Sequence, residues 1–237
     1  ALDGAQKKVE TYFFDIRKQL FEYDQVLNQQ RQKVYADRRL ALAADDATVM
    51  DTLLRYSDET VDDILAANVA DPTDVPDDLW ESLVGKFQQY CSSYNQLDAD
   101  AVRTLYKSQG YDAVYDKFVE IGREAVVEKR ETVEAAQPGL MAEAARYFLL
   151  TQTDNLWKEQ LQAMKFIQQA VGLRGYAQKD PLTEYKLEGF ELFKEMQAQI
   201  RRNVIYSAYN MDVARMNKVD DAEPSSADKV PADAASS

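Results

Sequence analysis

Residues 155–206 read NLWKEQLQAMKFIQQAVGLRGYAQKDPLTEYKLEGFELFKEMQAQIRRNVIY, with apolar side chains at helical spacing on both sides of a short polar loop. The first half predicts a helix over about 140–173 that ends at Gly175, because glycine suits the left-handed conformation of a helix C-cap. The second half predicts a helix that begins at Pro181, whose fixed φ suits the first helical position, with Asp180 as its N-cap. The two helices are expected to form an antiparallel hairpin.

The facing stripes of this hairpin consist of large apolar residues three or four positions apart. They are Leu156, Leu161, Met164, Ile167 and Val171 in the first helix and Tyr185, Leu192, Phe193, Met196, Ile200 and Val204 in the second. The loop between the helices consists of Arg174, Gly175, Tyr176, Ala177, Gln178 and Lys179. From the residues alone, we expect a polar turn with Tyr176 packed back onto the hairpin.

The first 41 residues carry a heptad-like seam of apolar positions at alternating steps of four and three. The seam consists of Val9, Phe13, Ile16, Leu20, Tyr23, Leu27, Gln30 and Val34. No proline and no glycine after Gly4 interrupts it. The seam therefore predicts one long helix, roughly 50 Å in length at 1.5 Å per residue. This helix is expected to end at residues 43–46.

Residues 47–138 predict shorter helices, with breaks at 71–76, around 92–98 and near Gly110. The prolines in the first break stop a helix because they lack an amide hydrogen. A compact all-α subdomain follows, and the break at residues 137–139 separates it from the hairpin. One buried face of this subdomain is predicted to consist of Leu79, Trp80, Leu83, Phe87 and Tyr90.

The net charge of this 237-residue chain is −13, and residues 42–80 alone carry −10. A solvated acidic face is the expected reason, and it argues against nucleic-acid binding by this segment. No apolar run approaches the roughly 20 residues needed to span a bilayer. Residues 211–237 are rich in Ala, Ser, Asp and Pro, which predicts a disordered tail.

Several kinds of chemistry are excluded by the composition. The chain has no His, so Ser-His-Asp triads and His-containing zinc or di-iron sites are absent. Neither GxxxxGK[ST] nor GxGxxG occurs, and Cys91 is the single cysteine. No catalytic, cofactor-binding or metal-binding residue is predicted. An acid/base enzyme that uses paired carboxylates stays open as an alternative.

Three motifs resemble SecA, the motor ATPase family of the Sec protein-translocation pathway. The hairpin loop and its flanks, residues 173–186, resemble the SecA fingertip, and residues 155–164 resemble the segment just before it. Residues 5–24 resemble the end of the long SecA scaffold helix. The variant is similar to the chloroplast or cyanobacterial type. One departure is Gln160, because the family commonly has His at this position.

This resemblance implies an architecture with four parts. Residues 1–41 would be the distal part of the helical scaffold, 42–138 the helical wing and 139–210 the two-helix finger, followed by the disordered tail 211–237. It also implies that the nucleotide-binding domains lie outside this chain, so the fragment would bind no cofactor while the parent protein uses ATP and Mg. The whole fold is then all-α, with the finger packed beside the scaffold helix.

The resemblance further implies a function and partners. A SecA-type finger enters the mouth of a SecY/SecE-type channel and touches the unfolded preprotein, with Tyr176 as the contact and Arg174 and Lys179 beside it. The scaffold charges Asp15, Arg17, Lys18 and Asp24 would meet the SecA motor domains. The expected location is the chloroplast stroma and the thylakoid membrane surface, bound peripherally, or alternatively the bacterial cytoplasm and inner membrane face.

Other assemblies and functions also fit the residues. A fragment without its motor domains is expected to expose part of the scaffold, and a homodimer is one consequence. The chief alternative function is a helical coiled-coil adaptor with no translocase role, since the seam and the hairpin would serve it equally well. An adaptor would not need the loop residues 174–179 in this order.

Overall fold

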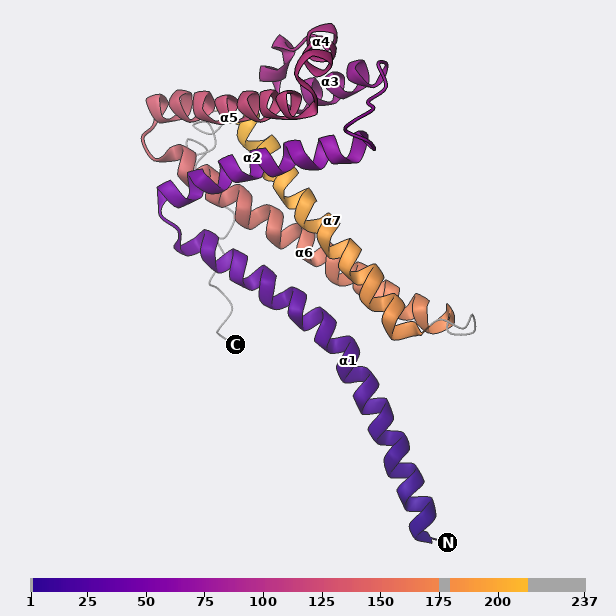
Figure 1. Cartoon of the computed structure of the whole chain (residues 1–237). Helices are drawn as coiled ribbons and strands as arrows, with labels where there is room; N and C mark the ends of the chain where they lie inside the picture. Colours follow the sequence, from indigo (N-terminus) through magenta and orange to yellow (C-terminus); the bar gives the residue numbers. More distant parts are fainter. Residues whose placement is uncertain (1, 175–179, 213–237) are drawn as a thin grey trace, which may run out of the picture.

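The computed structural model describes residues 2–174 and 180–212; within this part the side chains of residues 2–5, 15 and 173–174 are not described. The described residues form helices and their connections, which confirms the all-α prediction (Figure 1). In chain order they are α1 (Leu2–Ala43), α2 (Asp46–Asn68), α3 (Leu79–Tyr90), the 3₁₀ helix η1 (Ser92–Gln96), α4 (Ala99–Gln109), α5 (Tyr111–Ala136), α6 (Leu140–Arg174) and α7 (Pro181–Tyr209).

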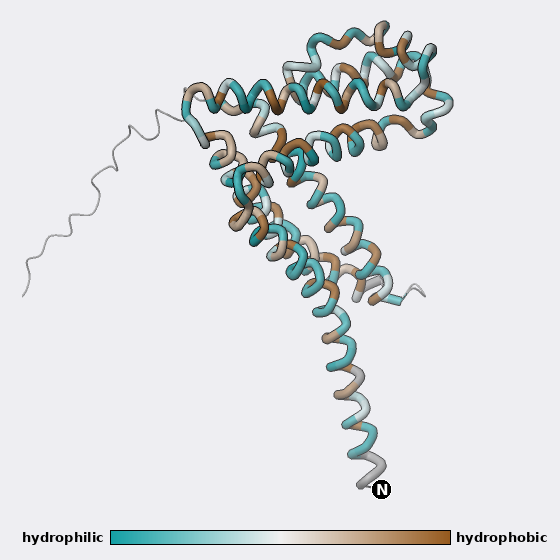
Figure 2. The backbone as a smooth tube through the Cα atoms, turned by 60° about the vertical axis from the view of Figure 1, so that its left-hand side comes forward, coloured by the Kyte–Doolittle hydropathy of each residue, from teal (hydrophilic) through white to brown (hydrophobic). Residues whose placement is uncertain are grey.

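The helices are arranged as a long rod that carries a compact group at one end. Helices α6 and α7 run side by side as the predicted hairpin, and the second half of α1 packs along them. The first half of α1 continues past the end of the hairpin, as both Figure 1 and Figure 2 show. The wing helices, which we define as α2 to α5, gather at the opposite end.

Aspartate side chains begin three of the helices. Asp45 accepts a hydrogen bond from the amide of Thr48 at 2.8 Å, and Asp180 accepts one from the amide of Thr183 at 3.0 Å. Asp98 accepts one from the amide of Ala101 in the first turn of α4. These bonds satisfy amides that have no partner within a first turn. Hydrogen bonds from Thr183 also hold the pKa of Asp180 below its usual range. The predicted start of α7 at Pro181, with Asp180 as N-cap, is thus confirmed.

The breaks between the wing helices also lie where the sequence predicts them. Helix α4 ends at Gly110, whose φ of 85° favours glycine, and a second positive φ, 83° at Gly139, lies between α5 and α6. The stretch from Ser92 to Gln96 was predicted as a break but forms the short helix η1. Trp80, Leu83 and Phe87 are fully buried on α3, as predicted.

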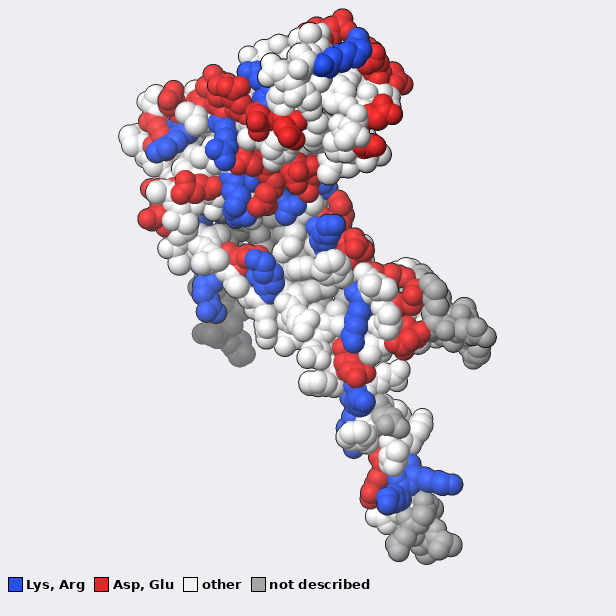
Figure 3. Space-filling model, in the orientation of Figure 1, with Lys and Arg blue, Asp and Glu red and all other residues white. Residues whose placement is uncertain are grey.

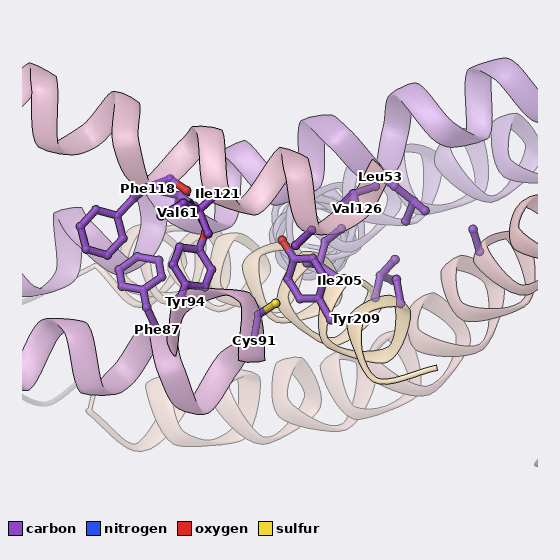
Figure 4. Packing of buried hydrophobic residues seen from close by; sticks show 14 of the residues in the cluster. Leu53, Val61, Phe87, Cys91, Tyr94, Phe118, Ile121, Val126, Ile205 and Tyr209 are labelled. Carbon is purple, nitrogen blue, oxygen red and sulfur yellow. Dashed lines mark hydrogen bonds between the residues drawn. The ribbon is translucent and has the colours of Figure 1, made fainter. Parts of the chain in front are cut away.

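The core of the wing is completed by the end of α7. Figure 4 shows Ile205 and Tyr209 of α7 beside Cys91 and the aromatic group of Phe87, Tyr94 and Phe118. Burial raises the pKa of Tyr209, and its hydroxyl lies 2.9 Å from Ser57 Oγ. The same hydroxyl donates to the carbonyl of Gly122 at 3.2 Å. One hydrophobic core therefore spans the predicted boundary between wing and finger.

Ion pairs connect the wing and the hairpin to their neighbours. Arg201 of α7 lies 2.7 Å from Asp63 of α2, and Arg38 of α1 makes a two-bond contact with Asp154 of α6. In the view of Figure 3, acidic side chains are dense over the wing helices, while charges of both signs follow α1. Along the described part of the chain, no helix has the length and hydrophobicity to cross a membrane.

The predicted C-terminal tail overlaps the described residues only at its start. Met211 is buried in the main core, and its carbonyl accepts a hydrogen bond from Lys129 at 3.2 Å. The rest of the predicted tail, residues 213–237, lies outside the described residues.

Candidate functional site

The hairpin loop is bounded by the last residue of α6 and the N-cap of α7. Of the six predicted loop residues, Arg174 ends α6, and its side chain is not described. Gly175, Tyr176, Ala177, Gln178 and Lys179 lie outside the described residues. The structure thus gives the two ends that present the loop, and the contacts of Tyr176 stay a prediction.

Two tyrosines close the base of this loop against the scaffold helix. The rings of Tyr23 in α1 and Tyr185 in α7 lie 4.8 Å apart between centroids. Burial and the nearby carboxylate of Asp180 raise the pKa of Tyr23, while burial and Asp24 raise the pKa of Tyr185. Both phenols are therefore neutral at physiological pH, and Tyr23 lies within electrostatic reach of Asp180, the N-cap of α7.

The distal cluster holds this end of the hairpin. We define it as the buried residues Met164, Ile167, Val171 and Tyr185, against which Tyr23, Val26, Leu27 and Leu192 pack. It is separate from the main core, which includes Val34 of α1 and Trp157 of α6. The hairpin thus contacts α1 through two groups of buried residues, and Leu27 of α1 packs against both.

A polar contact lies beside the distal cluster. Gln30 of α1 is 6% exposed and Gln160 of α6 is 5% exposed. Gln160 Nε2 donates to Gln30 Oε1 at 3.1 Å, and Gln30 Nε2 donates to the carbonyl of Gly189 in α7 at 2.9 Å. The seam predicted Gln30 to face the hairpin, but it did not predict the partner of Gln160.

Of the predicted scaffold charges, Arg17 and Lys18 lie on the uncovered half of α1, whereas Asp24 lies next to Tyr23, which packs against the distal cluster. Arg17, Lys18 and Asp24 are exposed, and the side chain of Asp15 is not described. The seam residues Val9, Phe13 and Leu20 are exposed as well, because the hairpin covers only the second half of the helix. The structure places these charges along one helix, and Asp24 lies close enough to Tyr185 of α7 to raise the pKa of that phenol.

Exposed aromatic residues on α1 went unnoticed in the sequence. Phe14 and Phe21 are exposed and lie seven residues apart, on a different face of the helix from the seam. Their spacing was the available signal, although two residues alone make a weak pattern. With the exposed seam, they leave apolar groups on two faces of the same helical segment.

The outer face of the hairpin is also partly apolar. Phe166 of α6 and Leu187 and Phe190 of α7 are exposed, with Phe166 at 73%. A groove of about 780 Å³ runs beside α7 and is lined by Ile167, Leu187, Leu192 and several charged residues. Phe166, Leu187 and Phe190 fall off the buried stripes, which is why periodicity did not single them out.

A second groove lies where α1, α2, α6 and α7 meet. It has a volume of about 440 Å³ and an apolar floor that includes Val34, Leu149 and Ile200. Its charged rim is paired internally, through Lys33 with Asp37 and Arg201 with Glu59. Across residues 2–174 and 180–212, no three potential metal ligands come together.

Comparison with known proteins identifies the relatives of this chain. Residues 1–212 match the family model described as the SecA Wing and Scaffold domain. The chain is 53% identical over 223 residues to the chloroplastic protein translocase subunit SecA of Ostreococcus lucimarinus, covering 94% of this chain and 24% of that protein. It is 54% identical over 222 residues to the chloroplastic SECA1 of Arabidopsis thaliana, covering 92% and 21%.

A cyanobacterial relative is slightly more distant. The protein translocase subunit SecA of Synechococcus elongatus is 46% identical over 214 residues, covering 90% of this chain and 22% of that protein. The chain therefore spans about a fifth to a quarter of the length of the curated relatives it matches.

Proposed function

Because this chain belongs to the SecA wing and scaffold domain family, we propose that it is the scaffold, wing and finger part of a subunit that moves unfolded preproteins through a SecY/SecE-type channel. The observation that carries the proposal is the family match together with a two-helix hairpin packed beside a long helix. Residues 1–41 serve as scaffold, 42–138 as wing and 139–210 as finger.

The energy source of the proposed translocase lies outside this chain. The sequence holds no phosphate-binding loop, so ATP and Mg would be bound by motor domains in the remainder of the parent protein. The chain itself acts as a binding and positioning unit. It would take no cofactor, and its role is to connect the motor to the substrate.

The first half of α1 is the proposed docking surface for those motor domains. It carries Arg17 and Lys18 among exposed apolar side chains on two faces, and Asp24 follows where the covered half begins. Contiguous apolar surface with a charged border is typical of a protein interface. Asp15 belongs to the same stretch.

The loop at the end of the hairpin is the proposed contact for channel and substrate. Tyr176 offers a large rigid surface that suits chemically varied chains, and its hydroxyl can reach backbone groups. Arg174 and Lys179 flank it with positive charge. Gly175, Ala177 and Gln178 complete the loop.

The relatives favour a plastid location. Two of the compared proteins are named as chloroplastic, so we place this chain in the chloroplast, in the stroma and peripherally at the thylakoid membrane. The cyanobacterial relative keeps the bacterial cytoplasm and the inner membrane face as the alternative.

A cross-linking experiment tests the proposed substrate contact. A photoreactive residue replaces Tyr176 in the full-length parent protein, which is then stalled with a preprotein in the channel. The expected result is a preprotein adduct at position 176 and none at Asn155, an exposed position of α6 far from the loop. Equal labelling at both positions would contradict the proposal, and silent alanine substitutions at 174–179 would favour the adaptor instead.

A further inference from the structure

The side-chain amide of Gln30 in α1 is buried and forms hydrogen bonds to both helices of the hairpin. We call the contact of Gln30, Gln160 and the Gly189 carbonyl the glutamine node. Gln30 Nε2 donates to the carbonyl of Gly189, and a carbonyl can only accept, so this contact fixes the orientation of the Gln30 amide. The Gln30 oxygen is then directed to Gln160 Nε2, which donates to it.

The packing around the node leaves little room for movement. A Cβ added to Gly189 would lie 2.7 Å from the Met164 methyl carbon and 3.8 Å from Gln30 Nε2. Gln30 Nε2 itself lies 3.9 Å from the Met164 sulfur. The glycine therefore lets α1 and α6 approach the backbone of α7 at this level, where its carbonyl can be reached by a side chain.

The node lies within the apolar contact between α1 and the hairpin, where Leu27 of α1 packs against both the main core and the distal cluster. The main core reaches Val34 on one side, and the distal cluster begins with Met164 on the other. Apolar surfaces are non-directional, so two helices with apolar seams can shift along one another at modest cost. A buried polar group resists such a shift, because each donor or acceptor left without a partner costs free energy.

We propose that the glutamine node sets the axial register of the hairpin on the scaffold helix, and that position 160 must supply a hydrogen-bond donor rather than an ionisable group. Gln30 is the positioning residue, because it forms hydrogen bonds to both hairpin helices, to Gln160 of α6 and to the Gly189 carbonyl of α7. A single buried polar residue that fixes the register of a helical seam is the best-attested use of such groups.

A fixed register would determine the position of the finger loop along the axis of α1. The loop lies at the end of the hairpin, so a shift of one helical turn against α1 moves it by about 5.4 Å. This consequence for translocation rests on the proposed function. The register itself is a property of the chain and can be measured without a channel, so either proposal can fail alone.

A distance measurement between spin labels tests the register. Labels are placed at the exposed positions Lys18 of α1 and Lys158 of α6, in the Cys91→Ala background of this chain. Lys18 lies about 18 Å along α1 from Gln30 at 1.5 Å per residue, so an axial shift changes the label distance directly. The unmodified node is expected to give one narrow distance distribution.

Three variants separate positioning from stability. Gln160→Leu leaves the Gln30 oxygen unpaired, so it should lower the midpoint of urea unfolding. It should also add a second population of molecules in which the hairpin is displaced along α1 by about 5 Å, one helical turn. Gln160→His keeps an N–H donor and should restore the single distribution. The double variant Gln30→Leu/Gln160→Leu removes both carboxamides and leaves the Gly189 carbonyl to the backbone hydrogen bonding of α7, so it should recover the urea midpoint while the displaced population remains.

A matched control completes the design. Val34→Leu changes a buried residue of the same seam that takes no part in the node, and it should keep the single distance. One narrow distribution at the original distance in the double variant would overturn the register proposal. A displaced population in Gln160→His would overturn the requirement for a donor.

Discussion

Gly122 is the residue whose lack of a side chain matters most for the wing core. A Cβ at this position would lie 2.7 Å from both Ser57 Oγ and the Tyr94 hydroxyl. Neither oxygen is free to move away, because Ser57 Oγ lies 2.9 Å from the Tyr209 hydroxyl and Tyr94 donates to the carbonyl of Phe118 at 2.9 Å. The glycine thus allows two tyrosine hydroxyls to find partners inside an aromatic core.

Substitution Gly122→Ala is expected to destabilise the protein. Alanine favours a helix over glycine by about 1 kcal/mol, but overpacking a tight core costs typically about 1–3 kcal/mol and here also strains two buried hydrogen bonds. We expect a net loss of about 1–2 kcal/mol in the free energy of unfolding, measured by urea denaturation.

The matched control is Gly85→Ala in α3, where an added Cβ meets nothing within 4 Å. This variant should gain about 0.5–1 kcal/mol from helix propensity alone. A stabilised Gly122→Ala protein would show that the hydroxyl contacts around Gly122 can relax.

At the scale of elements, α1 is one helix with two environments. Its 42 residues form a continuous α-helix, yet only the second half is covered by the hairpin. In the first half, hydrogen bonds along the backbone face solvent and few apolar side chains are buried. Helical stability in proteins comes mostly from packing of an apolar face, so the two halves should open independently.

Hydrogen exchange should reveal this difference. In dilute solution, amides of residues 6–22 are expected to exchange at least about tenfold faster than those of residues 30–43, which corresponds to about 1.4 kcal/mol in opening free energy. Residues 164–171 of α6, which are in the distal cluster, serve as the protected reference. Uniform protection along α1 in the monomer would contradict the two-environment description.

Local patterns in the sequence predicted most of these elements. The long first helix, the cap at Asp180 and the buried stripes of the hairpin depend on spacing within one helix, which a sequence displays directly. The extent of the seam did not follow, because the position where the hairpin stops covering α1 depends on contacts between distant segments. The contact between Gln30 and Gln160 is of the same long-range kind.

At the scale of the molecule, the main core contains buried residues from both sides of residue 138, the predicted boundary between wing and finger. Val204 belongs to the stripe that the sequence indicated for α7, whereas Ile205 and Tyr209 turn toward the wing. Periodicity identifies a buried face but not its partner. The wing and the hairpin are therefore folded around one core, although they form two units along the sequence.

The exposed half of α1 should make the isolated chain self-associate. Phe14 and Phe21 lie on one face and the uncovered seam on another, so a second copy can bury both. Sedimentation velocity over a wide range of concentrations is expected to show a rising average sedimentation coefficient. The double variant Phe14→Glu/Phe21→Glu should weaken the rise.

The control for this prediction is Tyr147→Glu, which changes an exposed aromatic residue of α6 away from the α1 surface. It should leave the association unchanged. A monomer at every concentration would count against association through α1.

The end of α7 inside the wing core has a consequence for biosynthesis. The wing helices are complete once Ala136 has been made, but Ile205 and Tyr209 are added later. At about 5–20 residues per second, the roughly 70 intervening residues take about 4–15 s. During this interval the nascent wing exposes the surface that α7 will cover, so protection by chaperones on the ribosome is needed most before the last helix emerges.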